Sequence, residues 1–267
     1  MKRSSALSVR LRPVVALLVA ALCLLPFAYL LLLSVVESWA FPRLVPGNLQ
    51  LRLWMRVLTG ASGLAGSFVQ SVLISSTVAF IATLAGFLTG KFVAYHPRRR
   101  GLLFLAYVPF VMSPVILGTC LMYLYLQLHL VGTTVGVIAA QSMFAYGFSI
   151  VLFSAFWNDR LQAYEALVHT LGGSSLQALW RVLLPMARPM LLICFFQTFL
   201  ISWFQYGLTL LIGAGKVQTL PLRVFAYVNE ANMYYAALAS CLLVLPPALL
   251  LWLNKRLLFR QTASGPV

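Results

Sequence analysis

The sequence predicts an all-α protein whose helices cross a membrane six times. Hydrophobic residues make up 62% of the 267-residue chain and charged residues only 9%, which is more apolar surface than a soluble core can bury. The apolar residues form long uncharged runs of membrane-crossing length. The 19 lysines and arginines, against four acids, cluster at the ends of these runs. The excess of positive charge therefore reflects the orientation of the spans in the membrane and contact with lipid headgroups, and not nucleic-acid binding.

The first span is predicted over residues 14–36. This uncharged run follows a basic start that holds Lys2, Arg3, Arg10 and Arg12. It is too long for the apolar part of a signal peptide, so we expect an uncleaved helix and a cytoplasmic N terminus. Residues 37–64 hold prolines, glycines and three arginines, which predicts an external segment with an interfacial helix near residues 49–58.

The next three spans are predicted from the lengths of the charge-free runs. No charge lies between Arg56 and Lys91, and the small residues of this second span predict close packing against its neighbours. The uncharged length 101–158 requires two spans, near 102–127 and 133–157, with a turn at Gly132. Pro109 and Pro114 predict a kink or an interruption in the third span.

The last two spans complete a topology that charge counting supports. We predict a fifth span over 190–215, an outer loop over 216–232 and a sixth span over 233–254. In this arrangement the cytoplasmic segments hold 14 of the 19 lysines and arginines and the external segments hold five. Both termini are therefore expected in the cytoplasm.

A polar stretch, residues 158–189, separates the fourth span from the fifth. Helix formers flank Gly172-Gly173, and Leu184-Pro185 closes the stretch. This pattern predicts a short helix, a glycine break, a second short helix and a proline stop before the next span. The stretch should therefore fold as a knob outside the membrane, on the cytoplasmic side.

This stretch resembles the cytoplasmic coupling loop of type I ABC importer permeases. The matching residues are Thr170-Leu171-Gly172, Ser174, Gln177-Ala178, Arg181-Val182, Leu184-Pro185 and Arg188-Pro189. Counting back from Gly172, the family's glutamate position falls on Ala166, and Glu165 stands one residue earlier, which is about 100° around a helix. The resemblance implies a coupling helix that contacts an ATPase through Glu165, Ala166, Gly172, Gly173, Ser174, Leu184 and Pro185.

The resemblance also implies an organisation and a set of partners. It divides the chain into an N-terminal tail, first span and external segment (1–64), a permease transmembrane domain (65–259) and a C-terminal tail (260–267). It implies two ABC ATPase subunits, a second permease, identical or related, and an extracytoplasmic solute-binding protein, at the bacterial inner membrane. The chain has no phosphate-binding loop of its own. We therefore expect ATP and magnesium on the ATPase subunits and no cofactor on this chain.

The solute and its path are predicted from weaker signals. The segment Thr219-Leu220-Pro221-Leu222-Arg223 resembles segments in permeases for polyamines, ferric iron, thiamine and phosphonates. Spermidine or putrescine is the first prediction for the transported solute. The resemblance places the fifth span beside the path, where the candidate lining residues are Gln197, Phe199, Ser202, Trp203, Gln205 and Tyr206. Their spacing puts Phe199, Trp203 and Tyr206 on one helical face. A packed or lipid-facing role is the alternative.

Other function classes fit the residues less well. His169 lies near Ser174 and Ser175, but no motif supplies an oxyanion hole, so no catalytic residue is predicted. The histidines and cysteines lack metal-ligand spacing, so no metal site is predicted. An ion-coupled carrier, the main non-enzyme alternative, usually places charged residues within the membrane, whereas all four acids here fall at or outside span ends.

Overall fold

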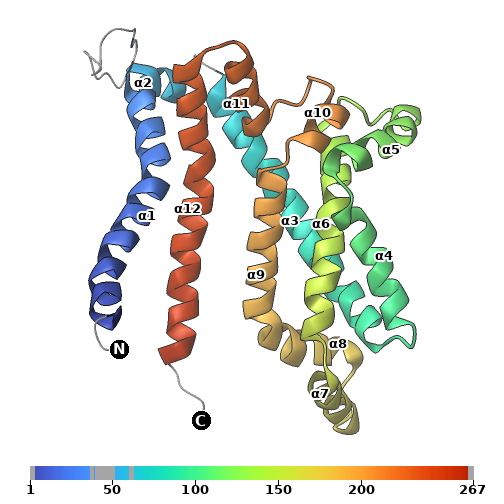
Figure 1. Cartoon of the computed structure of the whole chain (residues 1–267). Helices are drawn as coiled ribbons and strands as arrows, with labels where there is room; N and C mark the ends of the chain where they lie inside the picture. The colour runs from blue at the N-terminus through green and yellow to red at the C-terminus, as the bar shows by residue number, and fades with distance from the viewer. Residues whose placement is uncertain (1–3, 37–38, 40–51, 60–62, 264–267) are drawn as a thin grey trace. The chain divides into compact units, whose positions relative to one another are not determined.

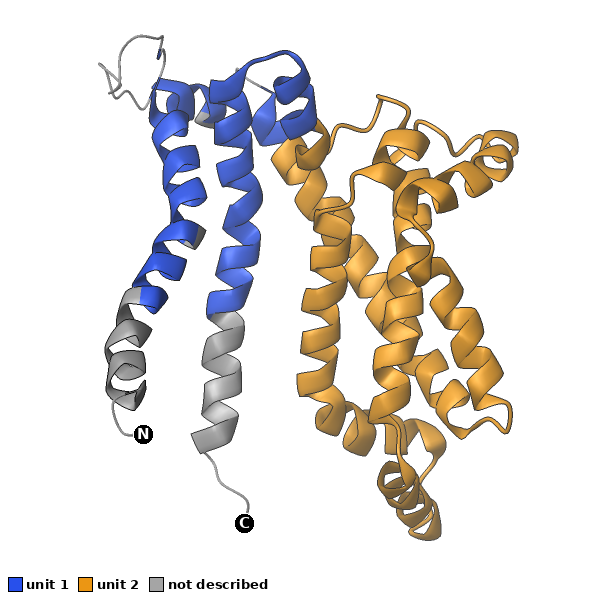
Figure 2. Ribbon diagram, in the orientation of Figure 1, with its two compact units in different colours: residues 1–66, 223–267 blue, residues 67–222 orange. Residues whose placement is uncertain are grey.

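The computed structural model describes residues 4–36, 39, 52–59 and 63–263, and these are almost entirely helical. They divide into two compact units (Figure 2): unit 1 comprises residues 1–66 and 223–267, and unit 2 comprises residues 67–222. Among the described residues, five helices are long and apolar enough to cross a membrane, or six if one bent pair forms a single span. The prediction of a helical, multi-pass membrane protein is confirmed.

Unit 1 is built on two long helices, α1 (Ser4–Val35) and α12 (Met233–Ala263), which run side by side (Figure 1). The short helix α2 (Arg52–Leu58) packs against α1. The hydroxyl of Tyr234, at the start of α12, donates to the backbone oxygen of Trp39 at 3.1 Å. The predicted first and sixth spans are confirmed. So is a helix within 49–58, although residues 49–51 lie outside the described part of the chain.

Unit 2 is a bundle around α3 (Leu64–Tyr95), which enters from unit 1, and α6 (Thr134–Phe156). These helices approach very closely: a Cβ atom on Gly90 would lie 2.7 Å from the Cβ of Phe153. Small residues allow such approach where lipid offers no hydrophobic force between helices. The predicted second and fourth spans, and the close packing of the second, are confirmed.

The predicted third span is two helices, α4 (Arg99–Val111) and α5 (Pro114–Gln127), bent by 97° at the break between them. Pro114 occupies the first turn of α5, and Ser113 before it is extended, because proline excludes the helical conformation from the preceding residue. The predicted interruption is confirmed. Helix α5 then packs against α10 (Gly207–Gly213).

The predicted limits of the fifth span, 190–215, are wrong at both ends. The helix α9 runs from Leu184 to Trp203, and residues 204–206 separate it from α10. At the start, Pro185 is no stop: α8 (Ser175–Ala178), the π-helical turn η1 (Leu179–Leu183) and α9 follow without a break. Pro185 has no amide hydrogen to donate to the preceding turn, but the π-helical turn η1 stands directly before it, and a local π-helical adjustment lets a helix continue through a proline. The ribbon nevertheless changes direction between α8 and α9 (Figure 1).

The predicted outer loop over 216–232 contains a helix, α11 (Leu220–Asn229). Pro221 lies in its first turn, where proline is tolerated. The backbone amide of Leu220 donates to the hydroxyl of Ser71 in α3 at 2.7 Å, so a contact far away in the sequence anchors the start of this helix.

Candidate functional site

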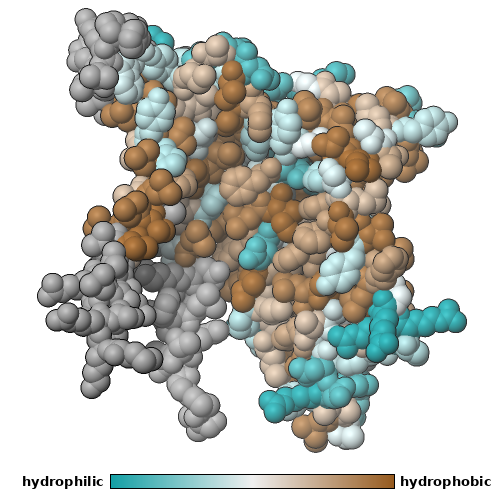
Figure 3. All heavy atoms as spheres, viewed as in Figure 1, coloured by the Kyte–Doolittle hydropathy of each residue, from teal (hydrophilic) through white to brown (hydrophobic). Residues whose placement is uncertain are grey.

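The polar stretch folds as a knob, which we define as residues 158–183. It comprises α7 (Asp159–Thr170), α8 and η1, and α7 projects beyond the ends of α6 and α9 in Figure 1. Hydrophilic residues gather at this end of unit 2, and hydrophobic residues cover the middle of its helices (Figure 3). This is the distribution of a helical bundle in a membrane with a folded element outside it.

A glycine turn ends α7. Gly172 has a φ of +78°, which glycine adopts without strain. The amide of Gly172 donates to His169 O at 3.0 Å and that of Gly173 to Val168 O at 2.9 Å, which is the Schellman pattern of a helix C terminus. A Cβ atom on Gly173 would lie 2.5 Å from Cγ1 of Val168. Both glycines of the predicted break are therefore required by its geometry.

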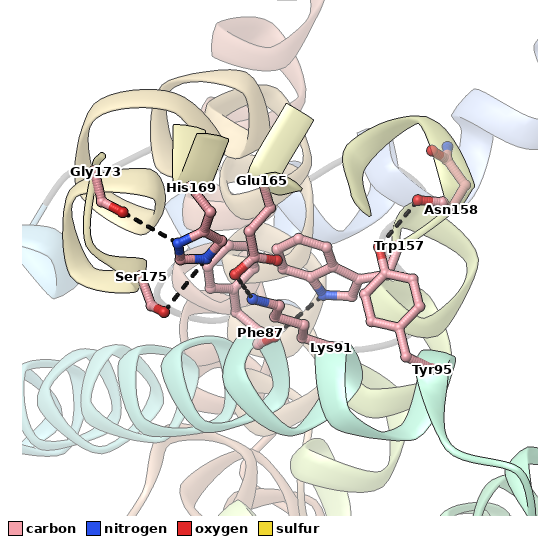
Figure 4. Close-up of polar contacts among 9 residues, drawn as sticks. All are labelled: Phe87, Lys91, Tyr95, Trp157, Asn158, Glu165, His169, Gly173 and Ser175. Atoms are coloured by element: carbon pink, nitrogen blue, oxygen red, sulfur yellow. Dashed lines mark hydrogen bonds and ion pairs between the residues drawn. The ribbon is translucent and has the colours of Figure 1, made fainter. Parts of the chain in front are cut away.

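The next helix starts directly after this turn. Ser174 caps α8: its hydroxyl accepts from the amide of Gln177, whose side chain accepts in return from the amide of Ser174, and the pair forms a capping box. His169 braces the turn, with Nδ1 3.1 Å from Gly173 O and Nε2 3.5 Å from the hydroxyl of Ser175 (Figure 4). The histidine and serine therefore have a structural role in this turn.

Polar contacts with α3 anchor the inner side of the knob (Figure 4). The Nζ of Lys91 lies 2.6 Å from Oε1 of Glu165, in the middle of α7. The indole of Trp157 donates to Phe87 O at 3.2 Å, and the hydroxyl of Tyr95 donates to Asn158 O at 2.9 Å. Below these contacts Leu161 packs in a core with Phe87 and Trp157. The knob is therefore held in place by hydrogen bonds, an ion pair and apolar packing.

The structure separates the predicted coupling residues into exposed and inward-facing groups. Ala166, Gly172 and Ser174 are exposed. Gly173, Leu184 and Pro185 are half-buried, and so is Glu165, whose side chain is 17% exposed and pairs with Lys91. The one-residue offset between Glu165 and Ala166 therefore matters: the glutamate faces the bundle, and an alanine stands at the exposed position.

An exposed apolar surface on the knob was missed by the sequence analysis. Its members are large hydrophobic side chains on α7, α8 and η1: Tyr164, Leu167, Leu171, Leu176 and Trp180. Leu171 is 79% exposed and Trp180 is 63% exposed, and hydrophobic atoms are visible among hydrophilic ones at the tip of the knob in Figure 3. The signal was present in the spacing of residues 164, 167 and 171, which share one face of a helix. Exposed apolar groups that gather on one element mark a contact with a protein or with a membrane, and Leu176 and Trp180 also belong to a candidate span, Ser175–Trp203.

The candidate path residues lie mostly inside unit 2. Phe199 and Trp203 are buried and stack with ring centroids 5.6 Å apart. Tyr206 is half-buried and lies beyond the end of α9, so its predicted place on one helical face with Phe199 and Trp203 is wrong. Gln197 is exposed on α9. That these residues line a translocation path stays a prediction.

A buried polar cluster connects four helices of unit 2. The hydroxyl of Ser202 donates to Oε1 of Gln141 and lies 3.2 Å from the hydroxyl of Ser75, and Nε2 of Gln141 donates to Thr209 at 2.8 Å. These residues belong to α9, α6, α3 and α10 respectively. Within the part of the chain that the structure describes, Nε2 of the buried Gln205 has no hydrogen-bond partner.

Comparison with known proteins identifies the family. A family model described as "Binding-protein-dependent transport system inner membrane component" matches residues 82–262, which include the whole knob. The chain belongs to this family. It is a type I ABC importer permease, a transport subunit and not an enzyme. The prediction that rested on the knob's sequence is confirmed.

Individual relatives of this permease are distant but span most of its length. The putative 2-aminoethylphosphonate transport system permease protein PhnV of Salmonella typhimurium is 24% identical over 241 residues, covering 87% of this chain and 88% of PhnV. The molybdenum transport system permease protein ModB of Mycobacterium tuberculosis is 27% identical over 220 residues, covering 76% and 82%.

A solved structure shares the fold of this permease. It belongs to a bacterial ABC transporter involved in the import of the acidic polysaccharide alginate. The two chains superpose with a TM-score of 0.59 at 18% identity, over 96% of this chain and 98% of the other.

Proposed function

We propose that the exposed apolar surface of the knob is where this permease binds its ATPase. The observation that carries the proposal is the exposure of Leu167 and Leu171, which precede the candidate span Ser175–Trp203, on an element that is held against α3. Apolar side chains outside the membrane lose contact with water when a partner covers them. Ala166, Gly172 and Ser174 would border the contact, while Gly173, Leu184 and Pro185 shape the loop. The knob and both termini would then be cytoplasmic, where ATP is.

The partners follow from this assignment. Two ATPase subunits would carry ATP and magnesium, and a second permease, identical or related, would complete the pathway at the bacterial inner membrane. A solute-binding protein would dock on the opposite side. Closure of the ATPases would move the knob as a rigid body, and the helices above it would follow. The permease domain in this proposal is residues 65–259, and it needs no cofactor of its own.

For the solute we propose a small phosphonate or an inorganic oxyanion. Two relatives that span most of this chain are named for transport of 2-aminoethylphosphonate and of molybdenum. These names favour the phosphonate alternative of the sequence analysis and give no support to the polyamine prediction. Phosphonates and oxyanions share an anionic group of several oxygens, which a binding protein recognises with hydrogen-bond donors.

Capture of the ATPase from detergent-solubilised membranes tests the docking surface. Replacement of Leu171 by Asp puts a charge on the apolar surface, and we expect it to reduce the ATPase retained by the purified permease at least tenfold, since an uncompensated buried charge costs several kcal/mol. The matched control is Leu128→Asp at the end of α5, an exposed leucine outside the knob. Equal retention by Leu171→Asp and wild type would contradict the proposal.

Uptake by intact cells tests the solute. Cells that lack this permease, with and without a plasmid that restores it, are given labelled 2-aminoethylphosphonate, molybdate or spermidine. We expect restored uptake of one of the two anions and unchanged uptake of spermidine. Restored uptake of spermidine alone would return the polyamine prediction to the first place while leaving the docking surface intact.

A further inference from the structure

We infer that Glu165 is a positioning residue that connects the ATPase-binding knob to α3 through Lys91, and that it does not contact the ATPase. The inference rests on the proposed docking of the knob. Glu165 lies in the middle of α7, but its side chain is 17% exposed and its Oε1 is 2.6 Å from Nζ of Lys91. The side chain is therefore mostly covered and paired within its own chain, and an ATPase finds the exposed Ala166 beside it.

Three residues on one face of α3 contact the knob or its connection to α6. Phe87, Lys91 and Tyr95 are four residues apart and therefore share a helical face. The first and last of them bond Trp157 and Asn158, which precede α7. The ammonium of Lys91 also lies 5.8 Å from the centre of the Trp157 ring, within range of a cation–π attraction. Of these polar contacts, the ion pair reaches furthest along the knob, because Glu165 is nearly two turns into α7 (Figure 4).

Helix α3 can carry a displacement from this contact to its other end. It is continuous over 32 residues and has no internal proline, so it spans about 48 Å at the usual rise of an α-helix. Sixteen residues before Lys91, or about 24 Å along the helix, Ser75 joins the polar cluster with Ser202 and Gln141. A movement of α7 that pulls on Lys91 therefore has a connected route to this cluster. Coupling between distant sites requires such a connected set of contacts.

Reversal of each charge, alone and together, tests the inference. The three variants are Lys91→Glu, Glu165→Lys and the exchanged pair, in a background whose four native cysteines are alanine. Val69→Cys, an exposed position near the other end of α3, reports movement by its rate of maleimide labelling. Labelling is compared between the nucleotide-free complex and the complex trapped with ATP and vanadate. ATPase capture is measured in parallel.

We expect the labelling rate of wild type to change about threefold or more on trapping. Each single reversal should lose this change while still capturing the ATPase. The exchanged pair should regain most of the change. Glu165→Gln keeps the shape of the side chain but removes its charge. It should therefore lose the change in labelling rate as the reversals do, and it serves as the second variant if a reversed chain fails to fold. Asp159→Lys, the same charge change on an exposed residue of α7, should leave the response intact.

Two results would overturn the inference. The first is loss of ATPase capture in Glu165→Lys with no recapture by the exchanged pair, because the glutamate would then contact the ATPase directly. The second is an unchanged labelling response in both single reversals. If the wild-type permease captured no ATPase, the proposed docking surface would be wrong as well. The wild-type experiment shows this result on its own, so it is distinguished from a failure of the inference about Glu165.

Discussion

Gly86 in α3 and Ser149 in α6 are in contact through their backbones: a Cβ atom on Gly86 would lie 2.3 Å from the Cβ of Ser149 and 3.1 Å from its carbonyl carbon. Neither of these atoms can rotate away, because both belong to the rigid part of a helix. One missing methyl group therefore sets the distance between the two central helices of unit 2.

Replacement of Gly86 by Ala is expected to separate α3 from α6 and to lower the free energy of unfolding by about 1–3 kcal/mol, the usual cost of overpacking. Thermal denaturation in detergent measures the loss. The control is Gly101→Ala in α4, where an added Cβ has no neighbour within 4 Å and alanine should stabilise the helix slightly. Addition of Ser149→Gly to the first variant should recover part of the loss. Equal stability of the two alanine variants would be inconsistent with the close contact.

Substitution of Gly172 should loosen the knob without unfolding the bundle. Alanine at a φ of +78° costs about 1–2 kcal/mol, and we expect faster hydrogen exchange in α7 and α8 than in α6. Asparagine tolerates the left-handed conformation, so Gly172→Asn should exchange more slowly than Gly172→Ala. The space around Gly172 is open, so a steric cause would not explain a difference between these variants. If alanine and asparagine gave the same exchange rates, the backbone explanation would be wrong.

Loss of the amide of Gln141 should have only a modest effect on stability. Gln141→Leu removes two buried hydrogen bonds, but Ser202 keeps Ser75 as a partner and Thr209 keeps the backbone oxygen of Gln205. Because hydrogen bonds between membrane helices are worth about 0.6 kcal/mol each on average, we expect a loss of about 1 kcal/mol in a denaturant titration. Gln197→Leu, at an exposed position on α9, is the control and should not destabilise. A loss above about 3 kcal/mol would mean that the hydroxyls are left without partners.

Local chemistry was enough to predict the knob. The predicted break at Gly172 and Gly173 ends one helix, and the structure adds that Ser174 with Gln177 starts the next directly after it, so the turn depends on six consecutive residues. The interruption of the third span was predictable from Pro109 and Pro114, whereas Pro185 did not end a helix. These features depend on residues near one another in the sequence, which a pattern can show.

Features that depend on distant residues could not be predicted. Lys91 and Glu165 are 74 residues apart, and nothing near either one identifies its partner. The break between α9 and α10 follows an apolar run that satisfies a helix pattern, and beyond the break α10 packs against α5 and α6, which are distant in the sequence. The exposure of Leu171 depends likewise on which face of α7 meets the bundle.

The bend between α4 and α5 has a consequence for the length of the predicted third span. Thirteen residues make α4 about 20 Å long, whereas the hydrocarbon core of a bilayer is about 30 Å thick. Because α5 turns away from α4 by 97°, α4 by itself is about 10 Å shorter than a helix that crosses this core. A crossing at this place therefore needs residues of both helices, and their break at Met112 and Ser113 belongs to the crossing segment.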